Sequence, residues 1–347
     1  MSVYQNTSAM LKRLSKDANR ITFSYLSISL LLLLFMVQSC GNSAEDSSDA
    51  FKVALLTPGP VSDAGWNASA YEGLQLIGTT IGAEVSQIET RTPADFEQGF
   101  RDYAGAGYDL IFGHGFEFQD AAATVSESFP GSVFITSSGT TVRDNVAPIV
   151  FEIEQATYLL GMISAYQSKS RKIGAVGGIE IPSVKSSFDA FAAGARSVDP
   201  EISVVVSYIG NWEDAGAAKE ATLALMDQGI DFIFHNADAA GLGVFQAAQE
   251  RGSVFVFGSN KNQNDIAPDV ILASAVLSIP TAMLTVAREV QNGSFSPSIR
   301  RLGMAENVVT LVINSKLRDR VPIEVWDAVA ESEGKIRSGE LTVPRGF

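Results

Sequence analysis

The sequence predicts an α/β protein built from two successive doubly wound lobes. Largely apolar runs such as DLIF (109–112) and SVFI (132–135) show no polar alternation, which is typical of parallel strands covered on both faces. These runs alternate with helical patterns, as expected for a doubly wound sheet. The same rhythm then restarts, because KIGAV (172–176) matches in character the KVALL (52–56) that opens the first half.

The elements can be placed in order along the chain. The first half is expected to hold a strand at 51–57, a helix around 68–78, a strand at 108–115, a helix at 119–129 and a strand at 132–138. The second half is expected to hold helices at 154–168, 184–198, 215–228 and 242–251, and strands at 171–178, 202–210, 230–237 and 253–260. Strands at 271–276 and 309–313 are expected to return across the halves, and a helix at 322–338 closes the chain.

This organisation divides the chain into lobes with a cleft between them. We expect a first lobe at 51–152, a second at 153–275, and crossing segments with a closing helix, shared between the lobes, at 276–347. In open sheets of this kind ligands bind at the carboxyl ends of the strands. The fold alone does not identify the ligand, since one fold hosts many functions.

Residues 1–39 have the pattern of an export signal. A basic segment precedes an almost wholly apolar run at 21–37, close to the lower length limit for a spanning helix. The chain's one cysteine, Cys40, ends the stretch LLLLLFMVQSC and begins a polar one. This arrangement resembles a bacterial lipobox, whose cysteine is acylated and becomes the first residue of the mature chain, although Gln38 fits that box imperfectly. An uncleaved anchor or another export signal is the alternative, and translation starting at Met10 would shorten the leader.

The predicted mature chain is strongly acidic. The full sequence has 25 basic and 39 acidic residues, of which residues 1–39 contain four basic and one acidic. The remaining chain therefore has 21 basic and 38 acidic residues, a net charge of −17. That balance argues against nucleic acid as a partner. Residues 41–49 are small, polar and acidic, so residues 40–50 are expected to form an acylated cysteine with a flexible tether.

The loops carry few signs of catalysis. Only two histidines occur, His114 and His235, and each follows a strand, whereas a metal site needs several ligands at suitable spacing. The loops GHGFEFQD (113–120) and GLGVFQAA (241–248) begin with G-x-G but lack the third glycine of a dinucleotide fingerprint. We therefore expect no catalytic residues, metal or cofactor, and interpret both loops as tight turns before helices.

Ordered loop motifs resemble those of the basic membrane protein family, the substrate-binding lipoproteins that include purine nucleoside receptors of ABC importers. The likeness covers nearly all of 51–344. The motifs are PVSDAGWNASAYEGL (60–74), GYDLIFGHGFEFQDA (107–121), FEIEQATYLLG (151–161), VGGIEIPSVKSSFDAFAAGA (176–195), GNWEDAGAAKEA (210–221) and GIDFIFHNADAAGLGVFQAAQERG (229–252).

The resemblance implies a periplasmic-binding-protein-like fold whose lobes close on a purine by hinge motion. Aromatic side chains sandwich the base in nucleoside-binding members, and the matching positions are Trp66 and Phe188; a core position is the alternative for both. Further ligand residues expected from the likeness are Ser62, Asp63, Asn67, Phe116, Asp120, Trp212, Asp238 and Asn260. Ser62 could instead cap the first helix, and Asp120 could compensate a helix dipole.

The sugar-binding positions of the family depart from its pattern. An aspartate that holds ribose hydroxyls in the family corresponds to Asn260, and a lysine with the same role corresponds to Leu277. Lys261 could substitute, but it lies one residue out of register and is expected to point the other way. We therefore expect a free nucleobase or another compact planar heterocycle rather than a ribonucleoside, unless Asn260 and ordered water hold the ribose.

Two functions compete. The first is a lipid-anchored receptor that faces the periplasm or cell exterior and passes a purine-like solute to an ABC permease. The second is a sensing lipoprotein that uses the same cleft, and an enzyme is a third and weaker alternative. A neighbouring permease and ATPase gene pair would favour transport.

Overall fold

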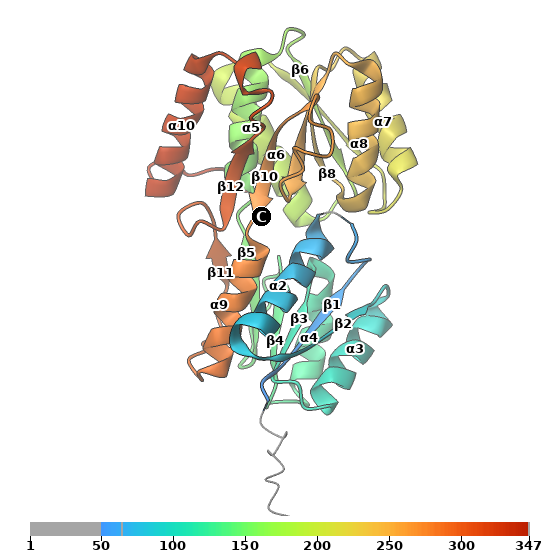
Figure 1. The fold of residues 1–347 in the computed structure, drawn as a ribbon, viewed down its shortest axis with the longest axis vertical. Coiled ribbons are helices and arrows are strands. Elements are labelled where there is room, and N and C mark those ends of the chain that lie inside the picture. Colours follow the sequence, from blue (N-terminus) through green and yellow to red (C-terminus); the bar gives the residue numbers. More distant parts are fainter. Residues whose placement is uncertain (1–49, 64, 346–347) are drawn as a thin grey trace, which may run out of the picture. The chain divides into compact units, whose positions relative to one another are not determined.

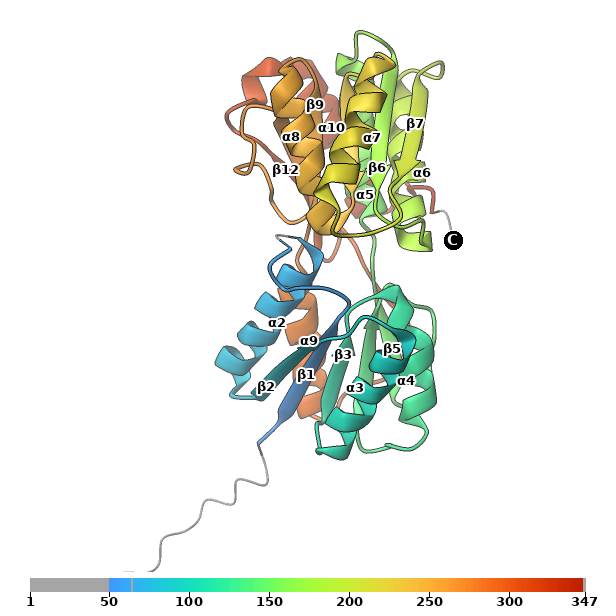
Figure 2. The ribbon, with the colours of Figure 1, turned by 90° about the vertical axis from the view of Figure 1, so that its right-hand side faces the viewer.

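The computed structural model describes residues 50–63 and 65–345. Residues 51–347 form one compact unit, and its two six-stranded sheets define the two lobes (Figures 1 and 2). The expected signal peptide, Cys40 and nearly all of the tether lie outside the described residues. None of the described helices is both long and apolar enough to cross a membrane.

The first sheet has the strand order β11-β5-β4-β3-β1-β2, and all its pairs are parallel. Its strands are β1 (Lys52–Thr57), β2 (Glu84–Glu89), β3 (Leu110–Gly113), β4 (Val133–Ser137), β5 (Val146–Phe151) and β11 (Arg300–Leu302). The helices of this lobe are α2 (Trp66–Ile81), α3 (Pro93–Gly105), α4 (Gln119–Ser126) and α9 (Ile279–Gln291). Figure 2 shows α2 and α9 on one face of the sheet and α3 and α4 on the other.

The second sheet has the order β12-β10-β9-β8-β6-β7, with only the β10–β12 pair antiparallel among the described strands. Its strands are β6 (Lys172–Gly177), β7 (Ser203–Tyr208), β8 (Phe232–Asn236), β9 (Phe255–Asn260), β10 (Ile271–Leu277) and β12 (Val309–Ile313). Its helices are α5 (Glu154–Gln167), α6 (Pro182–Val198), α7 (Ala215–Asp227), α8 (Gly241–Arg251) and α10 (Ile323–Ser338).

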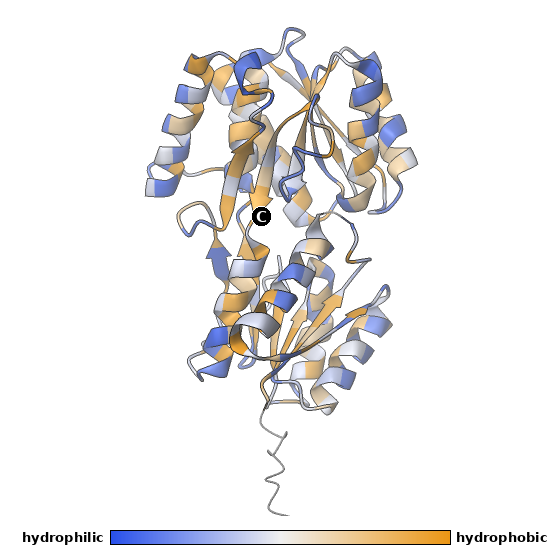
Figure 3. Ribbon diagram, in the orientation of Figure 1, coloured by the Kyte–Doolittle hydropathy of each residue, from blue (hydrophilic) through white to orange (hydrophobic). Residues whose placement is uncertain are grey.

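Alternate side chains of strand β1 explain why its sequence is continuously apolar. Val53 and Leu55 belong to the cluster that includes residues of α2 and α9, whereas Ala54 and Leu56 belong to the cluster built with α3 and α4. Successive side chains of a strand point to opposite faces, so helices on both faces bury the strand from Val53 to Thr57. Figure 3 shows the resulting hydrophobic strands between helices that carry hydrophilic outer residues.

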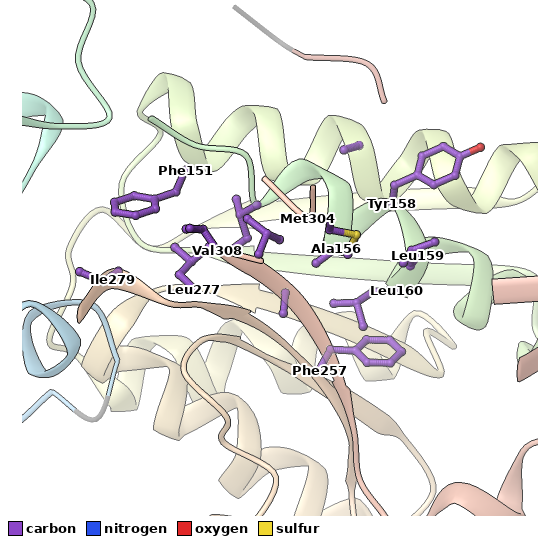
Figure 4. Close-up of a cluster of buried hydrophobic side chains, with 14 of the residues drawn as sticks. Phe151, Ala156, Tyr158, Leu159, Leu160, Phe257, Leu277, Ile279, Met304 and Val308 are labelled. Carbon is purple, nitrogen blue, oxygen red and sulfur yellow. The ribbon is translucent and has the colours of Figure 1, made fainter. Parts of the chain in front are cut away.

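Three segments connect the two sheets. The chain passes from β5 to α5, from β10 to α9, and from β11 to β12. Apolar side chains at these crossings pack in one cluster; Figure 4 shows Phe151, Leu277, Ile279, Met304 and Val308 among its members. The crossings therefore share core packing with both lobes rather than running through solvent.

Local sequence signals fix the ends of several helices. Thr92 caps α3 by accepting from the Asp95 N–H, and the Asp95 carboxylate accepts in turn from the Thr92 N–H, while Pro93 occupies the first helical position. This is a capping box. Helix α2 ends at Gly82, whose φ of 70° lies in the left-handed region that favours glycine.

The predicted two-lobed α/β fold is confirmed, and the elements expected from sequence all have counterparts. The structure adds β2, α3, β5, α9 and β11. Strand β2 lies at a sheet edge with no fully buried residue, so its sequence is polar. Strand β11 has three residues, which is too short for a detectable period.

Candidate ligand-binding cleft

A cavity is lined by both lobes at the carboxyl ends of their strands. The first lobe contributes Pro58, Trp66, Gly115, Phe116, Glu117, Ser138 and Phe151. The second lobe contributes Ile181, Ser183, Val184, Trp212, Asn236, Asp238 and Asn260. Ile153 and Leu277, which lie at two of the crossings, complete the lining. The cavity therefore lies where the strand order of open α/β sheets predicts a ligand site.

Asp63 organises the start of helix α2. Its carboxylate accepts hydrogen bonds from the backbone N–H groups of Gly65, Asn67 and Ala68 at 3.0, 2.7 and 2.9 Å. Asn67 and Ala68 belong to the first turn, whose N–H groups lack helical partners, so the Asp63 carboxylate caps the helix from two residues before its N-cap, Gly65. Ser62 is exposed and is not the cap, because the carboxylate one residue later already satisfies these donors.

Trp66 is fixed at the cavity by contacts with His114. The two rings are stacked, and the Trp66 ring N–H donates to the His114 carbonyl at 3.3 Å. The His114 ring contacts the Trp66 carbonyl at 3.1 Å and the Ser137 hydroxyl at 2.9 Å. Burial lowers the pKa of His114 to about 3, so the imidazole is neutral. Phe151 meets the Trp66 ring edge-on, with centroids 5.9 Å apart.

Trp212 is the second tryptophan of the cavity. A Cβ atom at Gly178 would lie 2.1 Å from the Trp212 ring, so this ring rests against bare backbone. Two backbone hydrogen bonds hold the loop: the Gly210 N–H donates to the Gly178 carbonyl, and the Ala240 N–H donates to the Trp212 carbonyl, each at 2.9 Å. Any side chain at position 178 would therefore displace the tryptophan.

Three lining residues have a left-handed backbone conformation that residues other than glycine rarely adopt. Ser138, Asp238 and Asn260 have φ values of 65°, 47° and 66°. The described residues contain five such non-glycine positions, and three of them line this one cavity. Left-handed conformations cost free energy and persist where surrounding structure enforces them, often at functional sites.

Asp238 lies among other acidic groups. It accepts from the Asn260 amide at 3.3 Å and from the Trp66 N–H. Burial, followed by the charges of Asp63 and Glu117, raises the pKa of Asp238 well above its ordinary value. Burial likewise raises the pKa of Glu117. Among the residues that the structure describes, no cation contributes to the pKa shift of either carboxyl group.

Several residues expected from sequence lie elsewhere. Asp63 and Asn67 line an adjacent cavity that shares Pro58, Trp212 and Asp238 with the first. Asp120 is exposed in the first turn of α4 and outside both cavities.

Phe188 is a core residue rather than a lining one. It is 2% exposed, and its ring packs against those of Tyr208 and Phe234. Val184, Phe191 and Ala195 are also buried on α6, so Phe188 falls on the apolar face of a periodic helix. The expected pairing of Trp66 with Phe188 across the cavity is therefore absent, and Trp212 lines the cavity in its place.

Of the two side chains considered above for sugar binding, Leu277 and Lys261, only the first lies at the cavity. Leu277 lines the cavity. The Lys261 ammonium pairs with Glu72 at 2.7 Å and is not among the lining residues, so it points away from the cavity as its register predicted.

Other lining residues were not anticipated, namely Pro58, Gly115, Glu117, Ser138, Phe151, Ile153, Ile181, Ser183, Val184 and Asn236. Asn236 is the last residue of β8 and Ser138 directly follows β4. Because the carboxyl ends of parallel strands meet at one edge of a sheet, these two residues could have been predicted from the sequence as lining residues. Across the described residues, no three His, Cys, Asp or Glu side chains form a group able to hold a metal ion.

Comparison with known proteins decides the family. Residues 50–345 match the family model described as ABC transporter substrate-binding protein PnrA-like, the Bmp family. The chain belongs to the Bmp family. The resemblance seen in the loop motifs is thereby confirmed, and the family is one of solute-binding proteins.

Individual relatives agree with this assignment. A purine-binding protein of Brucella abortus is 28% identical, over 86% of this chain and 84% of its own. The nucleoside-binding protein BmpA of a Lactococcus lactis ABC transporter is also 28% identical, over 88% and 92%. A solved ABC solute-binding protein from Aeropyrum pernix superposes with a TM-score of 0.78 at 22% identity, over 85% and 94%, which supports the fold.

Proposed function

We propose that this Bmp-family protein captures a purine nucleobase or nucleoside in the inter-lobe cavity and delivers it to an ABC permease. The observation that carries the proposal is the pair of tryptophans, Trp66 and Trp212, that line one cavity from different lobes. Flat aromatic rings suit a planar heterocycle, since stacking adds about 0.5–1.5 kcal/mol per pair to the burial of apolar area. The names of the Brucella and Lactococcus relatives support the same ligand class.

A nucleobase is favoured over a nucleoside. Leu277 lines the cavity with an apolar side chain, and Lys261 is engaged with Glu72. Neither can therefore bond a sugar hydroxyl, and a buried hydroxyl without a partner costs about 1–3 kcal/mol. Of the three positions compared with the family's sugar site, only Asn260 brings a polar side chain to the cavity.

The receptor is proposed to act without catalysis and outside the cytoplasm. Acylation at Cys40 would hold it on the membrane through the tether at 40–50, with the cleft facing the periplasm or cell exterior. Among the ligand residues expected from the sequence, Trp66, Phe116, Trp212, Asp238 and Asn260 have positions that support direct contact.

A paired thermal-shift and calorimetry panel tests the proposal. Adenine is compared with adenosine, guanine with guanosine, and hypoxanthine with inosine. Binding by either member of a pair supports purine capture, and larger stabilisation by the bases supports the nucleobase. Consistently tighter binding of the nucleosides would reject the preference for a nucleobase. The absence of binding across the panel would reject purines as the ligand class. Turnover of any bound ligand would reject the non-catalytic role.

A further inference from the structure

We propose that the cavity ranks purines by their exocyclic amino groups, because its side chains offer hydrogen-bond acceptors in excess of donors. The inference rests on the purine-binding function proposed above and specifies which purines are preferred. It is carried by the hydrogen-bond partners of the lining residues.

Two lining asparagines have an amide oxygen that can accept a hydrogen bond from a ligand. The Asn236 amide nitrogen donates to the Ser187 hydroxyl at 3.2 Å, and the Asn260 amide nitrogen donates to Asp238 at 3.3 Å. Both side chains are more than nine-tenths buried. In the described part of the chain no protein donor reaches either Oδ1 atom, yet neither is sealed from solvent-sized space. Each Oδ1 is therefore an acceptor left for a ligand.

Two carboxyl groups add further acceptors. Asp238 and Glu117 both line the cavity, and no Lys, Arg or His is among the described lining residues. Arg91 lines the adjacent cavity and is engaged with other carboxylates. Arg91 pairs with Glu89 and with Glu213, at 2.5 and 3.3 Å. The raised pKa of Asp238 has the cause expected for such a cluster, namely burial and like charges without a counter-charge.

Side-chain donors are fewer. The Trp66 ring N–H is directed to the His114 carbonyl. The other lining side chains that can donate are Trp212, Ser138 and Ser183, together with the second N–H of the Asn236 and Asn260 amides, and a hydroxyl serves equally as an acceptor. A ligand amino group, which donates hydrogen bonds, would therefore find more side-chain partners in the cavity than a ligand oxo group, which only accepts them.

The size of the effect follows from the number of acceptors that an amino group can reach. A hydrogen bond to an amide or carboxyl oxygen contributes a few-fold to about ten-fold in affinity. An oxo group that faces these acceptors gains nothing and loses its hydration. Each added amino group should therefore tighten binding by a few-fold to about ten-fold.

Four ligands isolate the amino groups. Guanine differs from hypoxanthine, and 2,6-diaminopurine from adenine, by a 2-amino group alone, whereas adenine has a 6-amino group and an unprotonated N1 in place of the 6-oxo group and N1–H of hypoxanthine. Calorimetry with these bases, and with their ribosides, is expected to give hypoxanthine the weakest and 2,6-diaminopurine the tightest binding. Equal affinities or the reverse order would overturn the inference while leaving purine capture intact. Binding of no base or riboside would overturn both.

Two variants test the residues. Glu117→Gln and Asp238→Asn replace an acceptor-only group with an amide that can donate, so each should lower the affinity ratio of 2,6-diaminopurine to hypoxanthine by several-fold. Glu127→Gln and Asp144→Asn are matched controls, because both parent residues are exposed and outside the cavity. The ratio cancels any general effect on lobe closure. An unchanged ratio in both cavity variants would overturn the assignment.

Discussion

Trp66 and His114 lie stacked, with ring centroids 4.0 Å apart and 22° between their planes. One face of the tryptophan is thus covered by a neutral imidazole, and the ring is held ready at the cavity. A ring fixed before binding loses little rotamer entropy when a ligand stacks on it. The stack explains how a residue in the first turn of a helix can serve as a rigid platform.

Trp66→Ala should weaken purine binding by about 2 kcal/mol, through lost stacking and lost apolar contact area. Calorimetry measures the change, and circular dichroism checks the fold. Tyr166→Ala is the control, since Tyr166 is an exposed aromatic residue outside the cavity. Unchanged affinity in Trp66→Ala would show that the ring does not stack on the ligand.

Asp238→Asn should stabilise the protein at neutral pH while impairing ligand selection. A carboxyl group whose pKa is higher in the folded state than in the unfolded state destabilises the fold at every pH above its unfolded-state pKa, because the folded state holds the proton more tightly. The stabilisation should therefore shrink as pH falls towards about 4. Asparagine also tolerates the left-handed backbone at this position. Urea unfolding at several pH values tests this, and a variant less stable than the parent at pH 7 would contradict it.

Acid should destabilise the fold through its two histidines. Burial lowers the pKa of His114 to about 3 and that of His235 to about 4. As pH falls below about 6.5, the unfolded chain gains protons that the folded chain excludes, so stability falls by about 1.4 kcal/mol per pH unit and histidine.

The comparison that isolates this effect is the parent against His114→Gln/His235→Gln. The buried carboxyl groups are common to both proteins, so the difference in free energy of unfolding reports the histidines. That difference should change steadily between about pH 6.5 and 4. A constant difference over that range would count against buried neutral imidazoles.

Gly161→Ala should destabilise the second lobe by about 3 kcal/mol or prevent folding. Its added Cβ would lie 1.9 Å from the Phe191 carbonyl oxygen, and on the facing helix a Cβ at Gly194 would lie 1.9 Å from the Tyr158 carbonyl oxygen. Gly334→Ala in α10 is the matched control, since its Cβ would meet no atom within 4 Å. Thermal unfolding should show the control at or slightly above the parent, and equal losses in both would refute the close helix contact.

Cys40→Ser should abolish acylation and release the protein from membranes. The reason is chemical, because the serine hydroxyl cannot replace the thiol to which the lipid is attached. Metabolic labelling with a radioactive fatty acid and membrane fractionation provide the measurements. Lipid retained on a protein altered only at Cys40 would show that the lipobox interpretation is wrong.

The sequence alone determined the two-lobed α/β architecture. Continuous apolar strands need cover on both faces, and Val53 to Leu56 show that cover in the structure. Edge elements escaped prediction for the converse reason, since polar β2 and the three-residue β11 have little buried surface to leave a pattern. Ordered loop motifs were likewise sufficient to indicate the family, because their order and register are preserved along the chain.

Only the tertiary structure decided which side chains line the cavity. Phe188 and Trp66 are both aromatic residues in the N-terminal halves of helices, yet Phe188 is buried on α6 whereas Trp66 is half-buried at the first residue of α2 and lines the cavity. Trp212 reaches the cavity because Gly178, distant in sequence, leaves room for its ring. The amide oxygens of Asn236 and Asn260 can accept from a ligand, whereas their amide nitrogens donate to Ser187 and Asp238. Such choices depend on contacts between separate elements, which local sequence patterns do not encode.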